Sequence, residues 1–110
     1  MKVEFKNKKL EKSLTVHSEI IKAYGVRAKK VKQRINEIRA SADVSTLMQI
    51  PAANCHELKG NRKGIFAVDI SGNWRLLFEP TCCTVPIKSD GSVDYQQIQS
   101  IKILEVKDYH

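Results

Sequence analysis

The densest group of side chains able to do chemistry lies in residues 56–64, which read His56-Glu57-Leu58-Lys59-Gly60-Asn61-Arg62-Lys63-Gly64. A histidine can transfer protons near neutral pH, and the three cations Lys59, Arg62 and Lys63 suit a phosphate group. The two glycines let the backbone approach a ligand closely. The spacing of a P-loop is absent. Taken alone, this stretch fits either a phosphate site or an ordinary solvent-exposed basic loop.

Two further groups could contribute to the same chemistry. Arg75 stands between Trp74 and Leu76, and the alternation of a strand turns it away from their face; a half-exposed strand carries such a residue without any function. The run Asp108-Tyr109-His110 follows an expected strand without a linker. Its histidine suits proton transfer, and its tyrosine can donate a hydrogen bond to a phosphate or stack on a base. Terminal residues are commonly frayed, so this run is only suggestive.

The cysteines do not indicate a metal or redox site. Cys82 and Cys83 are neighbours, which rarely form a disulfide, and no CxxC pair occurs. A metal site of Cys55, His56 and Cys82 would lack the usual paired spacing. We therefore expect no metal, no cofactor and the reduced thiols of a cytoplasmic protein.

The positive charge is concentrated in the first part of the chain. The whole sequence has a formal charge of +7, whereas residues 1–40 hold twelve basic and four acidic side chains, a net +8. Residues 41–110 hold seven and eight, a net −1. Such a field attracts polyanions such as nucleic acid, although a solvated helical face has the same composition.

A chain of 110 residues that is 42% hydrophobic predicts one globular domain. No apolar run reaches the roughly 18–20 residues that a bilayer span needs. A basic start without an apolar stretch behind it does not resemble a secretion signal. Membrane, secreted and multidomain proteins are thus not expected.

The N-terminal third predicts one strand and two helices. Residues 2–5 alternate polar and apolar side chains, which is typical of a strand. Residues 8–24 have an apolar helical spacing that slips around Val16 and His17, and Gly25 suits the end of this helix. A second helix follows from a cleaner stripe: Ala28, Val31, Ile35, Ile38 and Ala42. The short separation predicts a helical hairpin.

The remaining residues predict mainly strands. Asp43 or Ser45 can cap a short helix that runs to Met48. Residues 65–70 and 74–78 form a predicted hairpin around Ser71-Gly72-Asn73, and a last strand is expected at residues 98–106. The expected fold is α+β, in which an N-terminal strand and a helical hairpin pack on a mostly antiparallel β-sheet.

These separated pieces occur together, in this order, in one protein family. The sequence resembles the HigB branch of the RelE/ParE toxin superfamily, the toxins of type II toxin–antitoxin pairs. The matching runs are residues 56–64, Ser71-Gly72-Asn73-Trp74-Arg75 and Asp108-Tyr109-His110. Residues 24–39 are similar to a subgroup of longer HigB-like proteins, whereas residues 81–97 form a longer insertion than in compact members.

The resemblance implies a ribosome-dependent mRNA endoribonuclease that inhibits translation. In such metal-independent cleavage, the 2′-hydroxyl of the RNA attacks the adjacent phosphate and expels the 5′-oxygen of the next nucleotide. The implied acid and base are His56 and His110. The residues implied to stabilise charge on the phosphate are Lys59, Arg62 and Arg75. Tyr109 would orient the phosphate or stack on a base, and Asp108 would hold a neighbouring side chain.

The resemblance also implies the partners. Lys29, Lys30, Arg62 and Lys63 are expected to contact RNA, and a cognate HigA-like helix-turn-helix antitoxin is expected to neutralise the toxin. His17 is expected to be an ordinary histidine of a helix surface. Two other functions stay open: a gyrase-poisoning toxin of the ParE type, which needs no acid or base, and a non-catalytic RNA-binding module, for which the few aromatic residues give little support.

Overall fold

The protein is built on one five-stranded sheet, which carries His56, Arg75 and Asp108 of the predicted active site. The computed structural model describes residues 1–60, 64–81 and 86–108. The strands are β1 (Lys2–Phe5), β2 (His56–Glu57), β3 (Phe66–Ser71), β4 (Trp74–Pro80) and β5 (Ser100–Asp108). Their order in the sheet is β1-β5-β4-β3-β2, with β1 parallel to β5 and all other neighbours antiparallel. The expected α+β class is confirmed.

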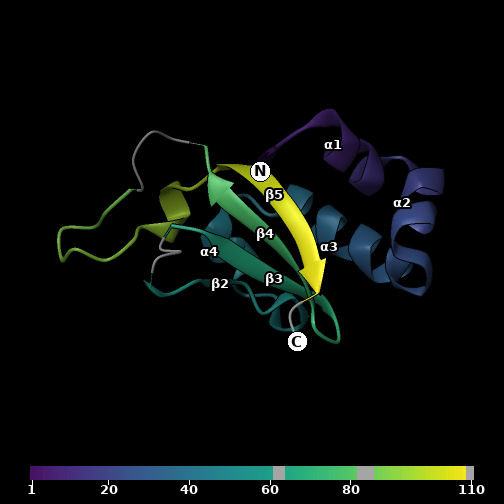
Figure 1. The fold of residues 1–110 in the computed structure, drawn as a ribbon. Helices are drawn as coiled ribbons and strands as arrows, with labels where there is room; N and C mark the ends of the chain where they lie inside the picture. The colour runs from purple at the N-terminus through teal and green to yellow at the C-terminus, as the bar shows by residue number, and fades with distance from the viewer. Residues whose placement is uncertain (61–63, 82–85, 109–110) are drawn as a thin grey trace.

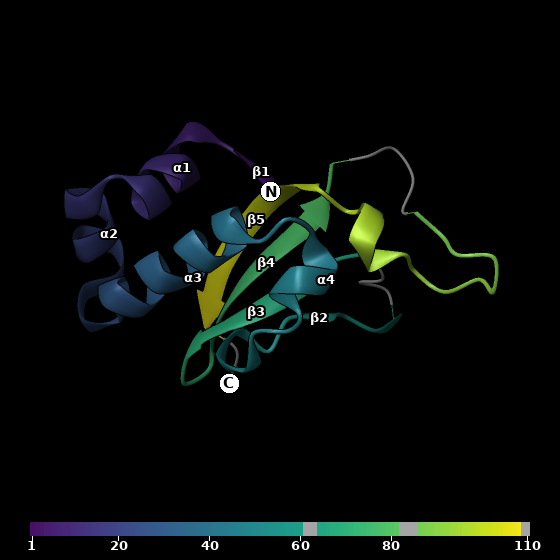
Figure 2. The ribbon, with the colours of Figure 1, turned by 180° about the vertical axis from the view of Figure 1, so that it is seen from behind.

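The helices gather on one face of this sheet. They are α1 (Lys8–Thr15), α2 (His17–Tyr24), α3 (Ala28–Ala40) and α4 (Val44–Leu47), with short 3₁₀ turns η1 (Gly25–Arg27), η2 (Pro51–Ala53) and η4 (Tyr95–Gln97). Figures 1 and 2 show α3 and α4 lying across one face, with α1 and α2 at one end. In the part of the chain that the structure describes, no helix covers the opposite face, which we call the open face. None of the described helices is long and apolar enough to cross a bilayer.

The single helix expected at residues 8–24 is in fact two. Asn7 caps α1 by accepting a hydrogen bond from the Leu10 amide at 2.8 Å. Val16 then adopts an extended conformation that ends α1 and begins α2. The prediction of one helix was therefore wrong at the position where the apolar spacing slips. Gly25 ends α2 as predicted, at a φ of +54° that favours glycine.

The second helix buries the predicted stripe except at its last member. Ala28, Val31, Ile35 and Ile38 are buried against the sheet. Ala42 is exposed and lies beyond α3, because Ser41 turns the backbone to an extended conformation. Asp43 caps α4 by accepting from the Thr46 amide at 2.8 Å. Hydrogen bonds from the Ser45 hydroxyl and the Thr46 amide hold the pKa of Asp43 below its usual value.

The core lies between the helices and the adjacent sheet face. Phe66 of β3 and Phe78 of β4 are paired across the two strands and stack with ring centroids 5.4 Å apart. Trp74, Leu76 and Phe78 share this face as predicted. The predicted hairpin is confirmed, with the strands extended to Ser71 and Pro80. The last strand begins at Ser100, later than predicted, although Ile98 just before it is buried.

Candidate active site on the open face

The open face carries two neighbouring rows of side chains that cross the sheet. In the first row the strand pairing places His56 opposite Ala67, Ala67 opposite Leu77, and Leu77 opposite Glu105. In the second row, Asp69 lies opposite Arg75, and Arg75 lies opposite Lys107. Because the two rows are two residues apart along β3 and β4, the imidazole of β2 and the guanidinium of β4 lie on the same face of the sheet, where Ala67 and Leu77 of the first row are buried.

His56 owes its place to a short edge strand that the sequence did not predict. The two-residue strand β2 pairs with β3 at the start of what had been interpreted as a loop. The Nδ1 atom of His56 lies 2.8 Å from the carbonyl oxygen of Asn54. A carbonyl only accepts, so Nδ1 donates and carries the proton. This leaves Nε2 as the nitrogen that can exchange a proton with a substrate.

Arg75 is held by Asp69 in a loose ion pair. Its Nε atom is 3.4 Å from Asp69 Oδ1, and this contact lacks the geometry of a hydrogen bond. The side chains of Arg75 and Asp69 are 39% and 33% exposed. Partly exposed ion pairs of this kind contribute little to stability, and a guanidinium is the side chain best suited to bind a phosphate through two hydrogen bonds. The other oxygen of Asp69, Oδ2, accepts from Asn54 Nδ2 at 3.1 Å.

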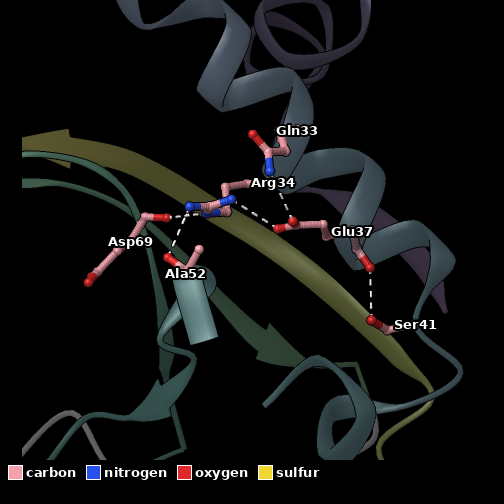
Figure 3. A network of polar contacts seen from close by, with 6 residues as sticks. All are labelled: Gln33, Arg34, Glu37, Ser41, Ala52 and Asp69. Carbon is pink, nitrogen blue, oxygen red and sulfur yellow. Dashed lines mark hydrogen bonds and ion pairs between the residues drawn. The ribbon is translucent and has the colours of Figure 1, made fainter. Parts of the chain in front are cut away.

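A buried arginine supports this part of the sheet from the helix side. Arg34 of α3 is only 3% exposed. It donates to the Asp69 carbonyl at 2.6 Å, to the Ala52 carbonyl at 2.9 Å and to Glu37 Oε1 at 3.1 Å (Figure 3). Arg34 is one of the twelve basic residues of the positively charged N-terminal part, but its guanidinium faces into the protein and does not add to the exposed charge.

A cavity of about 480 Å³ opens beside β2 and includes two predicted site residues. His56 and Lys59 both line it, and Tyr95 of η4 lies on its wall. Burial, with Glu57 and Cys55 nearby, raises the pKa of Tyr95. Burial also raises the pKa of Cys55 to about 12, so this thiol stays protonated and unreactive. The cavity thus combines an apolar wall with the histidine and a lysine.

The other predicted residues have different outcomes. Lys29 and Lys30 are exposed on α3, in the helix layer, so the structure does not bring them together with His56 and Arg75. Asp108 ends β5 opposite Trp74, one step from the row that contains Arg75. The remaining predicted residues lie outside the described part of the chain: Arg62, Lys63, Tyr109 and His110.

Three polar residues of this network were missed in the sequence. Two of them could have been recognised. Asp69 is a carboxylate inside an apolar strand, and Arg34 is a charged residue on the apolar stripe between Val31 and Ile38. Asn54 could not, because its contacts depend on the folded sheet. Among the described residues, no group of three or more His, Cys, Asp or Glu side chains is placed to hold a metal ion.

Comparisons with known proteins identify the family and a likeness of fold. The family model described as the RelE-like toxin of type II toxin–antitoxin system HigB matches residues 3–86, a range that ends before β5. The solved structure of the YoeB/ParE toxin from Agrobacterium tumefaciens aligns over 100% of both chains, with a TM-score of 0.51 and 14% sequence identity, a likeness of fold. No curated protein matches the chain. Because the family model covers well over half of the sequence, this protein belongs to the HigB-like family of RelE-type toxins of type II toxin–antitoxin systems.

Proposed function

We propose that this toxin is a ribosome-dependent endoribonuclease that cuts mRNA in the cytoplasm and so inhibits translation. The observation that carries the proposal is the joint presence, on one face of the sheet, of a histidine held through Nδ1 by the Asn54 carbonyl and a partly exposed arginine paired with Asp69. A group that transfers protons and a group that binds phosphate are what metal-independent RNA cleavage requires.

In the proposed reaction the RNA supplies its own nucleophile. The 2′-hydroxyl loses its proton and attacks the adjacent phosphorus, and the bond from phosphorus to the 5′-oxygen of the next nucleotide breaks. His56, through Nε2, takes part in one of the two proton transfers. Arg75 leaves Asp69 and stabilises the negative charge that builds up on the phosphate oxygens. Lys59, at the neighbouring cavity, adds a second positive charge.

The end of the sequence completes the proposal. Asp108 follows Lys107, the residue opposite Arg75, so β5 ends next to the row that contains Arg75, although Asp108 itself shares the helix-covered face with Trp74. We assign the second proton transfer to His110 and the orientation of the phosphate or stacking on a base to Tyr109. Asp108 would hold one of these neighbouring side chains.

The partners follow from the toxin family and from the charge. A type II toxin has a cognate antitoxin, which we propose to be a HigA-like helix-turn-helix protein. Lys29 and Lys30 lie in the helix layer, so we propose that they contact ribosomal RNA while the open face receives mRNA, with Arg62 and Lys63 as further RNA contacts. This arrangement uses the surplus of positive charge without placing it in the active site.

The decisive experiment compares two histidine variants in a cleavage reaction with purified protein and programmed ribosomes. His56→Gln should lower the rate of mRNA cleavage by about 10²–10⁴-fold, because general acid–base catalysis contributes that much. His17→Gln is the matched control, since His17 is exposed on α2, where it lies 3.2 Å from Lys32 Nζ. Its rate should equal that of the wild type, and naked mRNA should stay intact in every reaction.

Other outcomes would contradict the proposal. Equal cleavage by the His56→Gln and wild-type proteins would remove His56 from the site. Growth arrest with intact mRNA and broken chromosomal DNA would instead indicate gyrase poisoning of the ParE type. Ribosome or RNA binding without arrest or cleavage would indicate a non-catalytic binding module.

A further inference from the structure

We propose that Asn54 is a positioning residue that holds His56 and Arg75 in a fixed relation to each other, an inference that rests on the proposed function. Asn54 contacts both halves of the site. Its backbone carbonyl accepts from His56 Nδ1 at 2.8 Å, and its side-chain amide donates to Asp69 Oδ2 at 3.1 Å. Asp69 is in turn the ion-pair partner of Arg75.

The backbone of Asn54 is held in an uncommon conformation. Its φ of +45° and ψ of +47° are left-handed, and it is the one residue other than glycine with a positive φ in the part of the chain that the structure describes. Asparagine tolerates this conformation better than most residues, but only glycine adopts it freely. The conformation turns the carbonyl toward His56 and the amide toward Asp69 from a single residue.

Arg34 supports the same connection from below. Its guanidinium donates to the Ala52 carbonyl, in the turn just before Asn54, and to the Asp69 carbonyl in β3 (Figure 3). The segment that leads into β2 is thus tied to β3 twice, once by a buried arginine and once by the Asn54 amide. The buried link fixes the two backbones, and the Asn54 link fixes the side chains on the open face.

This double connection sets the distance between His56, which transfers a proton, and Asp69, the carboxylate from which Arg75 reaches the phosphate. Cleavage needs both at the same phosphodiester, and a displacement of about 1 Å can lower a rate by about 10²-fold. When Arg75 leaves Asp69 for the phosphate, the Asn54 amide keeps the Asp69 carboxylate in place. Arg75 then moves from one anion, the Asp69 carboxylate, to another, the phosphate of the RNA.

The simpler interpretation is that Asn54 only ends the turn η2. Asparagine is common in the left-handed position after a helical turn. Glycine would serve that role at least as well, because it has no Cβ to strain the backbone. The two interpretations therefore differ on the variant Asn54→Gly: a residue that only ends the turn predicts an unchanged cleavage rate, and a positioning residue predicts a lower one.

The test measures single-turnover mRNA cleavage on programmed ribosomes with the variant Asn54→Gly. We expect the rate to fall by about 10-fold or more, with a melting temperature equal to or above that of the wild type. Gln49→Gly is the matched control, because it adds a glycine to the same segment between α4 and β2. Gln49 is exposed, and its side chain makes no hydrogen bond to the described part of the chain. Its rate should stay within about twofold of the wild type.

A second measurement needs neither ribosome nor cleavage. The ¹⁵N resonances of the His56 ring report which nitrogen carries the proton in the neutral form. In the wild type we expect the Nδ1–H form, held by the Asn54 carbonyl. In Asn54→Gly the carbonyl is no longer fixed by the amide, so the fraction of this form should fall, while Gln49→Gly should match the wild type.

The two measurements separate the possible failures. An unchanged cleavage rate in Asn54→Gly, or an unchanged His56 tautomer, would overturn the positioning role. If the wild type itself does not cleave mRNA, the proposed function fails. The ring resonances then still decide whether Asn54 orients His56, and a changed tautomer would support that role.

Discussion

At the scale of single residues, the proposed site combines a partly exposed ion pair with a histidine that is held at one ring nitrogen. Arg75 has a partly exposed anionic partner at 3.4 Å, and His56 keeps one ring nitrogen for substrate. A tight, buried ion pair would have to be broken before Arg75 could meet a phosphate. The loose pair on the open face avoids that cost.

We expect Arg75→Ala to abolish growth arrest on induction and to lower mRNA cleavage by about 10²–10³-fold, because it removes a charge that stabilises the transition state. The variant should fold, since the ion pair that it removes is partly exposed. Circular dichroism and cleavage assays on the purified protein check both points. Arg39→Ala, an exposed arginine of α3, is the control and should remain toxic. Persisting toxicity of Arg75→Ala would show that the site is assigned wrongly.

The residue types of the site were predictable, but their connections were not. His56, Lys59 and Arg75 stood out because histidine and cations near glycines suit a phosphate. The link from Asn54 to Asp69 joins residues 15 positions apart, through a strand pairing that no local pattern specifies. Polar contacts across strands depend on register, and register is a property of the folded sheet.

At the scale of elements, α3 has two roles on two sides. Its inner side buries an apolar stripe, and Arg34 within that stripe satisfies carbonyls of η2 and β3. Its outer side carries the exposed Lys29 and Lys30. The helix therefore anchors the strand that holds Asp69 while presenting positive charge to solvent.

Replacing Arg34 by methionine, which has a similar length, should lower the free energy of unfolding by about 3 kcal/mol. The Asp69 and Ala52 carbonyls would lose their donor, and a buried acceptor without a partner costs about 1–3 kcal/mol. Urea denaturation measures the change. Arg39→Met should stay within about 0.5 kcal/mol of the wild type, because its side chain is exposed. Equal stability of Arg34→Met and Arg39→Met would contradict the proposed anchoring role.

The elements themselves were largely predictable, and the errors have physical causes. Strong periodic patterns gave α3, β3 and β4 to within a few residues. The break at Val16 was marked only by a slip in the apolar spacing, which a bent helix would also show. The strand β2 has two residues, too few for any alternation, and it exists because β3 offers it an edge.

At the scale of the whole molecule, charge and chemistry lie in different layers. The surplus of positive charge belongs to residues 1–40, most of which form the helix layer and β1. His56, Asp69 and Arg75 of the proposed site lie on β2, β3 and β4, at the open face. A large RNA surface can therefore hold the toxin by one side while a single strand of RNA meets the other.

We expect the double variant Lys29→Gln and Lys30→Gln to weaken ribosome binding and to reduce its dependence on salt. Each lost phosphate contact should lower the slope of log affinity against log salt by about 0.7–0.9. Binding measured at several salt concentrations gives this slope. Lys88→Gln, an exposed lysine in the loop before η4, should leave the slope unchanged. A slope equal to that of the wild type in the double variant would show that α3 does not contact RNA.

The sheet cannot assemble in the order in which its strands are synthesised. Lys2 of β1 pairs with Ser100 of β5, so β1 cannot form its strand pairing until nearly the whole chain has been synthesised. β5 also closes the edge of β4, from Trp74 to Pro80. A nascent chain that has not yet reached β5 therefore has an unpaired β4 edge and an uncovered core, a state that invites aggregation and proteolysis. A ribosome that stalls before residue 100 would consequently release a fragment that cannot complete the toxin fold.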